Sequence, residues 1–251
     1  MPADVAADAA AMALVGARRE CRRVSSKRFP IESRDDAYAV QDATLAAIGP
    51  IGGWKVCAAA PGNEPTCAPL PADGLMPRTA TLRGSEWHLR GVEAEIAFVL
   101  GADLPPRSVP YTHDDVAHAV ASVVPAIEVA ETRWIDWLDA NPVALLADLL
   151  SHGGLVLGEP APFDRRWFDL SRIEVAMCFD DQVVAHTVGE HAHPDVGVLM
   201  AWLANHCATR GAALKAGQVI TTGSCTGMLF ASEGTTVRAE VVGLAPFAAF
   251  F

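Results

Sequence analysis

A short apolar run that carries two acidic residues constrains this chain more than any other feature. The run is Gly91-Val92-Glu93-Ala94-Glu95-Ile96-Ala97-Phe98-Val99-Leu100. Successive side chains of a β-strand point to opposite faces, so Glu93 and Glu95 share one face, roughly 7 Å apart. The other face is apolar and holds Val92, Ala94, Ile96 and Phe98. The run predicts an apolar strand with two carboxylates side by side on one face.

Two neighbouring carboxylates repel each other and are costly to bury unless a cation lies between them. A second apolar run, Pro125-Ala126-Ile127-Glu128-Val129-Ala130, carries one more acid in its middle. Three strand glutamates form a facial set of oxygen ligands for Mg²⁺ or Mn²⁺ that leaves positions open for substrate and water. A Glu-x-Glu strand that simply faces solvent is the alternative.

The composition excludes several classes of protein. The chain has 251 residues, of which 51% are hydrophobic and 20% charged, so we expect a large core in one domain or two intimate ones. The formal net charge of -11 argues against a nucleic-acid partner, because binding to phosphates is driven by cations. A small anionic substrate is not excluded, because a metal ion or lysine at the site can outweigh the negative electrostatic potential of the whole chain.

The cysteines and the first residues indicate a cytoplasmic location. Six cysteines are scattered without Cys-x-x-Cys pairs or zinc spacing, which predicts reduced thiols. Residues 1–13 lack the basic start and apolar run of a signal peptide. No apolar stretch approaches the ~20 residues of a membrane span.

The pattern along the chain predicts an α+β fold. We expect helices at about 6–23 and 33–48, one that begins at Thr112, and two more at about 141–150 and 196–210. The predicted caps are Ser33 with Asp36, Thr112 with Asp115, and Asn141. The segment 60–77 is rich in proline and is interpreted as an irregular lid or linker. Beyond the strands at 54–57 and around Glu93 and Glu128, we expect a hairpin over 172–188 and strands at 219–222, 235–242 and 247–251. Residues 1–75 form the predicted N-terminal helical segment with a strand and loop, and residues 76–251 the β-rich core.

Short motifs in a fixed order resemble a known family. The chain is similar to the 2-keto-4-pentenoate hydratase and 4-oxalocrotonate decarboxylase group of the fumarylacetoacetase-like superfamily. The motifs span residues 36–251 and include Gly53-Trp54-Lys55-Val56, Ala72-Asp73, the Glu93 and Glu128 strands, Gly154-Leu155-Val156-Leu157-Gly158, Leu214-Lys215-Ala216-Gly217 and Thr222-Gly223-Ser224. The resemblance implies a fumarylacetoacetase-like, mixed β-roll core with an N-terminal helical portion.

The resemblance also implies a site and a substrate class. Glu93, Glu95 and Glu128 match the family's ligands for Mg²⁺ or Mn²⁺, while Lys55 matches its active-site lysine and Asp73 the acid of its loop. Thr222-Gly223-Ser224 matches the turn at the substrate end. The implied substrates are small 2-keto or 2-hydroxydienoate acids from aromatic-ring degradation. A homo-oligomer and association with a related pathway enzyme are further implications.

The roles of the lysine and the aspartate remain open from the residues alone. A partly buried Lys55 between Trp54 and Val56 is expected to have a pKa lowered toward neutrality, as suits proton transfer. It equally suits a fixed cation for a carboxylate, or a surface position at a loop edge. Asp73 precedes Gly74 and suits either a proton relay or a turn.

Two departures from the family pattern alter the expected pocket. Many relatives carry Gly and a Thr-Ser pair after the lysine, whereas this chain has Cys57-Ala58-Ala59-Ala60. Relatives often have Asp-Asn where this chain has Asp148-Leu149. Both changes remove polar groups and leave the three glutamates intact.

The leading prediction is a metal-dependent hydratase of 2-hydroxy-2,4-dienoates. The runner-up is a decarboxylase of a 2-oxo-diacid, which needs a cation for the second carboxylate, and Arg133 is the candidate. An acylpyruvate hydrolase is disfavoured because residues 57–77 hold no histidine. A non-catalytic partner subunit is the alternative from another class. His152 is expected at a helix end, where a cationic side chain is favourable.

Overall fold

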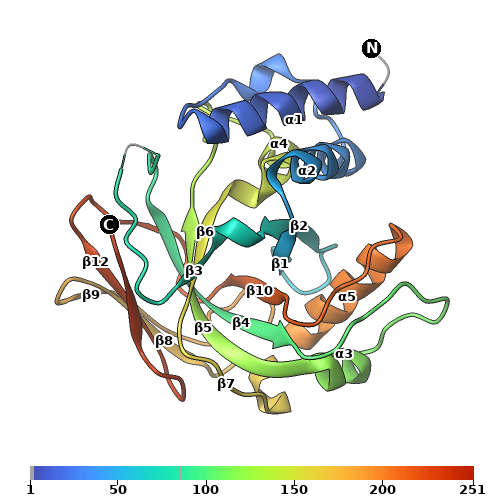
Figure 1. The fold of residues 1–251 in the computed structure, drawn as a ribbon. Helices are drawn as coiled ribbons and strands as arrows, with labels where there is room; N and C mark the ends of the chain where they lie inside the picture. The colour runs from blue at the N-terminus through green and yellow to red at the C-terminus, as the bar shows by residue number, and fades with distance from the viewer. Residues whose placement is uncertain (1–2, 85) are drawn as a thin grey trace.

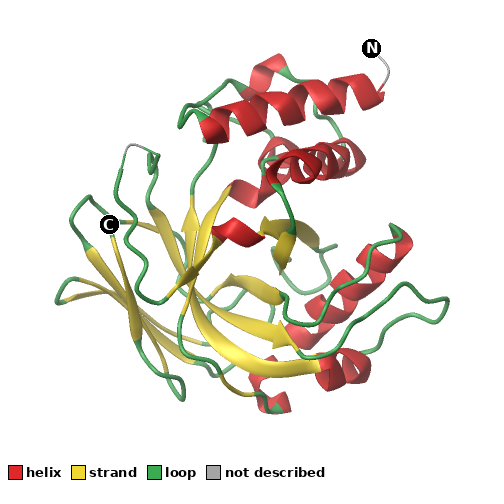
Figure 2. Cartoon of the chain, viewed as in Figure 1, coloured by secondary structure: helices red, strands yellow, loops and turns green. Residues whose placement is uncertain are grey.

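The computed structural model describes residues 3–84 and 86–251, which form an N-terminal group of helices beside two β-sheets (Figures 1 and 2). The α-helices are α1 (Ala3–Arg19), α2 (Arg34–Ile48), α3 (His113–Ala119), α4 (Pro142–Ala147) and α5 (Val196–Thr209). Short 3-10 helices are η1 (Ser26–Arg28), η2 (Ala72–Gly74), η3 (Leu149–Ser151) and η4 (Arg165–Phe168). In Figure 1, α1, α2 and α4 lie together over one end of the strands, while α3 and α5 lie together elsewhere.

Capping residues set the starts of three helices, as the sequence predicts. Ser33 with Asp36 forms a capping box at α2, and Thr112 with Asp115 forms another at α3. Asn141 accepts a hydrogen bond from the Val143 amide at the start of α4. These side chains occupy backbone N–H groups that the first helical turn leaves without partners.

The larger sheet has nine strands and carries the acidic residues. Its main order is β2-β1-β10-β4-β5-β6-β3, and β11 and β7 add to β4 and β5. The strands are β1 (Ile51–Cys57), β2 (Thr66–Pro71), β3 (Leu75–Pro77), β4 (Gly91–Leu100), β5 (Val120–Ala130), β6 (His152–Leu157), β7 (Ala161–Pro162), β10 (Val219–Ser224) and β11 (Leu229–Phe230).

The second sheet has four strands in the order β13-β12-β8-β9. Its members are β8 (Glu174–Phe179), β9 (Gln182–Val188), β12 (Thr236–Val241) and β13 (Phe247–Phe250). The predicted hairpin is β8–β9, and the predicted C-terminal strands are β12 and β13. The mixed α+β class is confirmed.

The apolar face predicted for β4 lies in the core. Val92, Ala94, Ile96 and Phe98 are fully buried. The Phe98 ring meets Phe168 edge-on, with 5.3 Å between centroids, a favoured aromatic geometry. Because this face packs into the core, Glu93 and Glu95 point to the other side of the larger sheet.

Three local predictions are wrong. The segment expected to be irregular contains β2 and β3, because β2 is an edge strand whose open side tolerates Pro69 and Pro71. The first helix ends at Arg19 rather than near residue 23. The helix α4 ends at Ala147, since Leu149, Leu150 and Ser151 adopt left-handed φ angles of 51°, 52° and 58°.

The predicted boundary near residue 75 follows α1 and α2, but β1 and β2 precede it and belong to the larger sheet, while α4, which packs on α2, follows it. The division into residues 1–75 and 76–251 stays a prediction. All six cysteines are free thiols. Within residues 3–84 and 86–251, no helix has both the length and the apolar character needed to cross a membrane.

Candidate functional site

Strand register brings the predicted acidic residues and the lysine to one face of the larger sheet. Glu93 on β4 lies opposite Glu128 on β5. Lys55 on β1 pairs with Thr221 on β10, and Thr221 pairs with Ala97, two positions from Glu95. Because side chains alternate along a strand, these residues share a face. Four neighbouring strands thus build the site.

Lys55 is tied directly to the third glutamate. Its Nζ lies 2.9 Å from Glu128 Oε1 and donates a second hydrogen bond to the Leu150 carbonyl at 3.3 Å. Glu128 is fully buried and Lys55 is 9% exposed. The surface position considered for Lys55 is therefore excluded. The Leu150 carbonyl belongs to the η3 turn, whose left-handed backbone points this oxygen toward Lys55.

Glu95 is held by the strand beside it. Thr221 donates its hydroxyl to Glu95 Oε2, and the Gly223 amide donates to the same oxygen at 3.4 Å. Glu95 is buried, whereas Glu93 is half-buried, and the Ser224 side chain acts to lower the pKa of Glu93. Gly223 has a φ of 110°, which L-residues rarely adopt, so a glycine suits this turn.

Burial and mutual repulsion raise the pKa of two of the carboxyls. Burial, then Glu128 and Glu93, raises the pKa of Glu95 well above its usual value. Burial also raises the pKa of Glu93, against the opposing charge of Lys55. At Glu128 burial acts in the same direction, but Lys55 and His152 outweigh it and lower the pKa. The three carboxyls behave as one electrostatic unit.

The expectation that the Lys55 pKa falls toward neutrality is wrong in this structure. Burial does favour the neutral amine. The charges of Glu128, Glu95 and Glu93 together outweigh it and raise the pKa above its usual range. Lys55 is a fixed ammonium here.

The donor chemistry fits a hard divalent cation. Three carboxylates face one ammonium, and Glu128 Oε2 is buried without a hydrogen-bond partner among the described residues. Across residues 3–84 and 86–251, however, no three acidic, histidine or cysteine side chains are already drawn together in the geometry of a metal site. Ligation by all three carboxylates would therefore need them to rotate toward a shared point.

His152 is a site residue that sequence reasoning missed. Its Nδ1 lies 3.2 Å from Glu128 Oε1, and its ring is fully buried. Burial lowers its pKa, so the expected cationic helix end is wrong. Gly74 packs against the ring so closely that a Cβ there would lie 2.6 Å from Nε2. Only the β5–β6 pairing, which sequence periodicity does not reveal, brings His152 to Glu128.

Asp73 and the predicted substrate turn lie at different depths. Asp73 is exposed in η2, immediately before the glycine that packs on His152. Thr222 is buried and donates its hydroxyl to the Ile96 carbonyl at 3.2 Å. Ser224 is half-buried and lies opposite Glu95 in the β10–β4 register. Gly223 and Ser224 therefore border Glu95, whereas the Thr222 hydroxyl is bonded to the backbone of β4.

Arg133 is buried beside the site rather than within it. Its Nε lies 2.7 Å from Asp148 Oδ1, and its backbone amide donates to Asp148 Oδ2 at 2.8 Å. Its guanidinium also donates to the His152 carbonyl at 2.9 Å. These bonds tie the segment after β5 to the turn before β6.

Comparisons with known proteins place this chain in a family. Residues 71–249 match the family model described as the fumarylacetoacetate (FAA) hydrolase C-terminal domain. A 2-keto-4-pentenoate hydratase of Paraburkholderia xenovorans is 30% identical over 227 residues, covering 86% of this chain and 83% of the relative. A 2-oxo-hept-4-ene-1,7-dioate hydratase of Escherichia coli is 29% identical, covering 89% and 88%.

A solved structure extends the likeness to the whole fold. The 4-oxalocrotonate decarboxylase of Pseudomonas putida G7, complexed with magnesium and adipate, superposes with a TM-score of 0.85 at 25% identity. The match covers 98% of this chain and 97% of that one. This chain belongs to the fumarylacetoacetate hydrolase family, and its group resemblance to the 2-keto-4-pentenoate hydratases and 4-oxalocrotonate decarboxylases is confirmed.

Proposed function

We propose that this chain is a divalent-metal-dependent hydratase that adds water to 2-hydroxy-2,4-dienoates during the breakdown of aromatic compounds. The observation that carries the proposal is the buried cluster of Glu93, Glu95 and Glu128 around the ammonium of Lys55. Several curated relatives are hydratases by name, which supports the reaction class.

Glu93, Glu95 and Glu128 would hold Mg²⁺ or Mn²⁺ through carboxylate oxygens. A metal bound there supplies Lewis-acid stabilisation of the negative charge that develops on the 2-oxo oxygen of the substrate. Glu128 Oε2 is buried and has no hydrogen-bond partner among the described residues, so it is available to coordinate a metal. The neighbouring decarboxylase structures contain magnesium or calcium, which supports a divalent cation.

Lys55 acts as a positioned cation. Its Nζ is fixed by Glu128 and by the Leu150 carbonyl, so it presents positive charge to an incoming carboxylate without reorganisation. Hydration of a dienoate requires a tautomerisation and then water addition, and both steps move protons. Asp73, exposed beside the site, takes up or returns a proton at its carboxylate. Ser224, opposite Glu95 in the β10–β4 register, would orient the substrate.

A decarboxylase of 2-oxo-diacids is the second candidate. It would use the same carboxylates and ammonium and would lose CO₂ instead of adding water. The extent of the structural match to 4-oxalocrotonate decarboxylase favours it specifically.

The expected homo-oligomer also remains a proposal. The edge strand β9 exposes Val183 and Val188, which are 64% and 56% accessible, and such a strand can pair with another chain. Light scattering coupled to size exclusion would give the mass in solution. The same run with a related pathway enzyme added would reveal a mixed complex, as the partner-subunit reading requires.

The test follows loss of ultraviolet absorbance of 2-hydroxypenta-2,4-dienoate with Mg²⁺ or Mn²⁺. Wild type and Glu93→Gln are compared with Glu240→Gln, a matched control on β12 whose carboxylate pairs with Arg238 away from the site. We expect metal-dependent loss that survives in the control and vanishes in Glu93→Gln. Product analysis then separates water addition from decarboxylation. No loss with any dienoate, despite tight metal binding, would contradict the hydratase proposal.

A further inference from the structure

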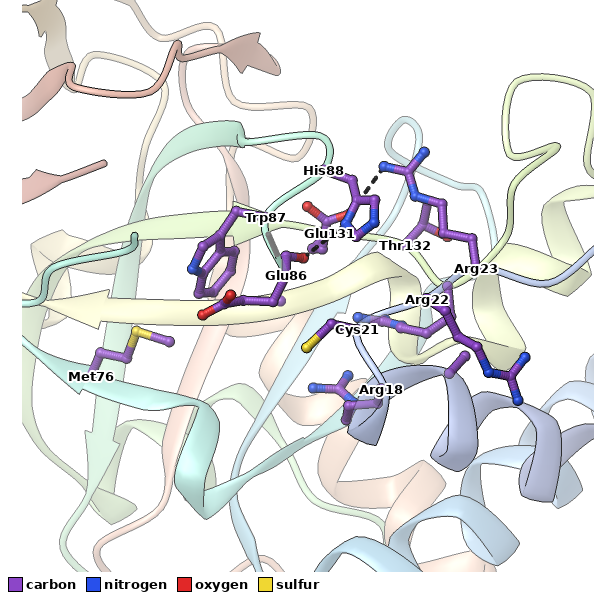
Figure 3. A pocket seen from close by; sticks show the side chains of 13 residues that line it. Arg18, Cys21, Arg22, Arg23, Met76, Glu86, Trp87, His88, Glu131 and Thr132 are labelled. Atoms are coloured by element: carbon purple, nitrogen blue, oxygen red, sulfur yellow. Dashed lines mark hydrogen bonds and ion pairs between the residues drawn. The ribbon is translucent and has the colours of Figure 1, made fainter. Parts of the chain in front are cut away.

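A cavity rich in arginine lies next to the candidate site and has no assigned role. It measures about 340 Å³ and is bounded by the end of α1, the loop before β4 and the start of β6. In Figure 3, Arg18 and Cys21, from the end of α1 and the turn after it, face Glu86 and Trp87 across this space. Arg133 and Gly153 also line it.

Three of the four arginines of the cavity have carboxylate partners within ion-pair distance, and Arg18 does not among the described residues. The pairs are Arg22 with Glu20, Arg23 with Glu131, and Arg133 with Asp148. Arg18 donates to the His152 carbonyl at 2.9 Å. A neutral carbonyl and the nearby C-terminal end of α1 stabilise its charge only in part.

The surroundings of Arg18 confirm that its charge is under-compensated. Burial, followed by repulsion from Arg133, lowers the pKa of Arg18 to about 10. Asp148 and Asp73 act in the opposite direction and do not balance these effects. The exposed Glu86 carboxylate lines the cavity mouth without an ion pair to Arg18. An anion that enters the cavity would supply the missing charge with a strong, charge-assisted hydrogen bond.

We propose that this cavity binds the carboxylate group of a small organic acid through the guanidinium of Arg18. The His152 carbonyl accepts from Arg18, while the His152 ring contacts Glu128, so the cavity lies one residue away from the carboxylate cluster. The bound group is the distal carboxylate of a dicarboxylate substrate or that of a separate acid. The first source rests on the proposed function. Trp87 would cover the apolar chain of either ligand.

The binding test uses metal-chelated protein, so that it does not depend on turnover. Heptanoate is titrated calorimetrically into wild type, Arg18→Gln and Arg19→Gln, with uncharged heptanamide as the ligand control. Arg19 is the matched control, because it lies next to Arg18 but is exposed and donates to the Ala47 carbonyl. We expect Arg18→Gln to weaken heptanoate binding about tenfold or more and Arg19→Gln to leave it unchanged. Equal affinities in all three proteins, or equal affinity for heptanamide, would overturn the proposal.

Kinetics with the metal-loaded enzyme identify the source of the carboxylate. If it is the distal end of the substrate, Arg18→Gln raises KM about tenfold for a seven-carbon 2-hydroxydiene diacid and leaves KM for the five-carbon monoacid unchanged. If KM is unchanged for both while heptanoate binding falls, the site holds a separate acid. A protein that binds heptanoate through Arg18 and turns over neither substrate would reject the proposed function and keep this site.

Two further measurements guard against a variant that does not fold. Arg18→Lys keeps the positive charge on a smaller ammonium group and is expected to retain most of the affinity for heptanoate. Hydrogen exchange of the last turn of α1 in wild type needs no variant, and heptanoate is expected to slow it. Unchanged exchange at saturating heptanoate would contradict the proposal.

Discussion

Replacement of Lys55 by methionine should destabilise the metal-free protein far more than loss of an ordinary surface lysine. The mutation removes the ammonium that pairs with Glu128, and Glu128 is fully buried. Breaking a buried ion pair by removing one partner costs about 3–5 kcal/mol, because the other charge is left without compensation. In a chain of this size, 1 kcal/mol corresponds to roughly 2–4 °C in Tm, so we expect a fall of about 10 °C.

The pH and metal dependence of this loss separate electrostatics from packing. The pKa of Lys55 is raised, so its contribution to stability is complete at neutral pH and is lost only as the pH rises through that raised value. In Lys55→Met, acidification toward pH 5 should shrink the deficit, because the unpaired carboxyls take up protons. Added Mg²⁺ should also restore stability, since a ligand of the folded state stabilises it.

Lys215→Met is the matched control, and differential scanning calorimetry in chelator is the assay. Lys215 pairs with Asp103 at 3.1 Å, but both side chains are at least half exposed. Exposed pairs contribute about 1 kcal/mol or less, which predicts a small shift. If the two variants lose the same stability, or if the Lys55→Met deficit is equal at pH 5 and pH 8, the reasoning is refuted.

Three other perturbations test separate parts of the structure. The pKa of Glu95 is raised, so its ionisation costs stability as the pH rises above 4.5. Glu95→Gln should therefore raise the free energy of unfolding of the metal-chelated protein, measured by urea melts at neutral pH, by on the order of 1 kcal/mol. A gain that persists at pH 4 would contradict this. Arg133→Met should cost about 3 kcal/mol through the stranded Asp148, and the double variant with Asp148→Leu should recover part of it; additive losses would argue against the pair. Hydrogen bonds from Ser26 and Ser25 outweigh burial and lower the pKa of Asp136 to about 2. Asp136→Asn should therefore reduce the free energy of unfolding at pH 7 by about 1 kcal/mol. In urea melts the difference between the two proteins should vanish as the pH falls from 4 to 2, and a difference that stays constant would exclude this linkage.

The sequence was sufficient for features that depend on local pattern. Period-two alternation around Glu93 predicted which residues of β4 share the apolar face and which share the acidic face, because strand geometry fixes that relation. Caps such as Ser33 and Thr112 predicted helix starts, because their side chains satisfy the first free amides. The short family motifs predicted the fold because they occur in a fixed order along the chain.

Features that depend on register and long-range pairing were not predictable from the sequence. The contact of His152 with Glu128 arises from the pairing of β5 with β6, which no local pattern encodes. The raised pKa of Lys55 depends on how many carboxylates surround it, whereas the sequence indicated only its apolar neighbours. The left-handed turn at Leu149 contradicts local propensity and is maintained by packing.

The central claim is that Glu93, Glu95 and Glu128 together bind one divalent cation. Electron paramagnetic resonance of Mn²⁺ measures this directly, because free and bound ions give different signals. We expect one tight ion per chain in wild type and in Glu240→Gln, and a loss of affinity of at least tenfold in each of Glu93→Gln, Glu95→Gln and Glu128→Gln. Wild-type affinity in any folded variant of the three glutamates would contradict the claim.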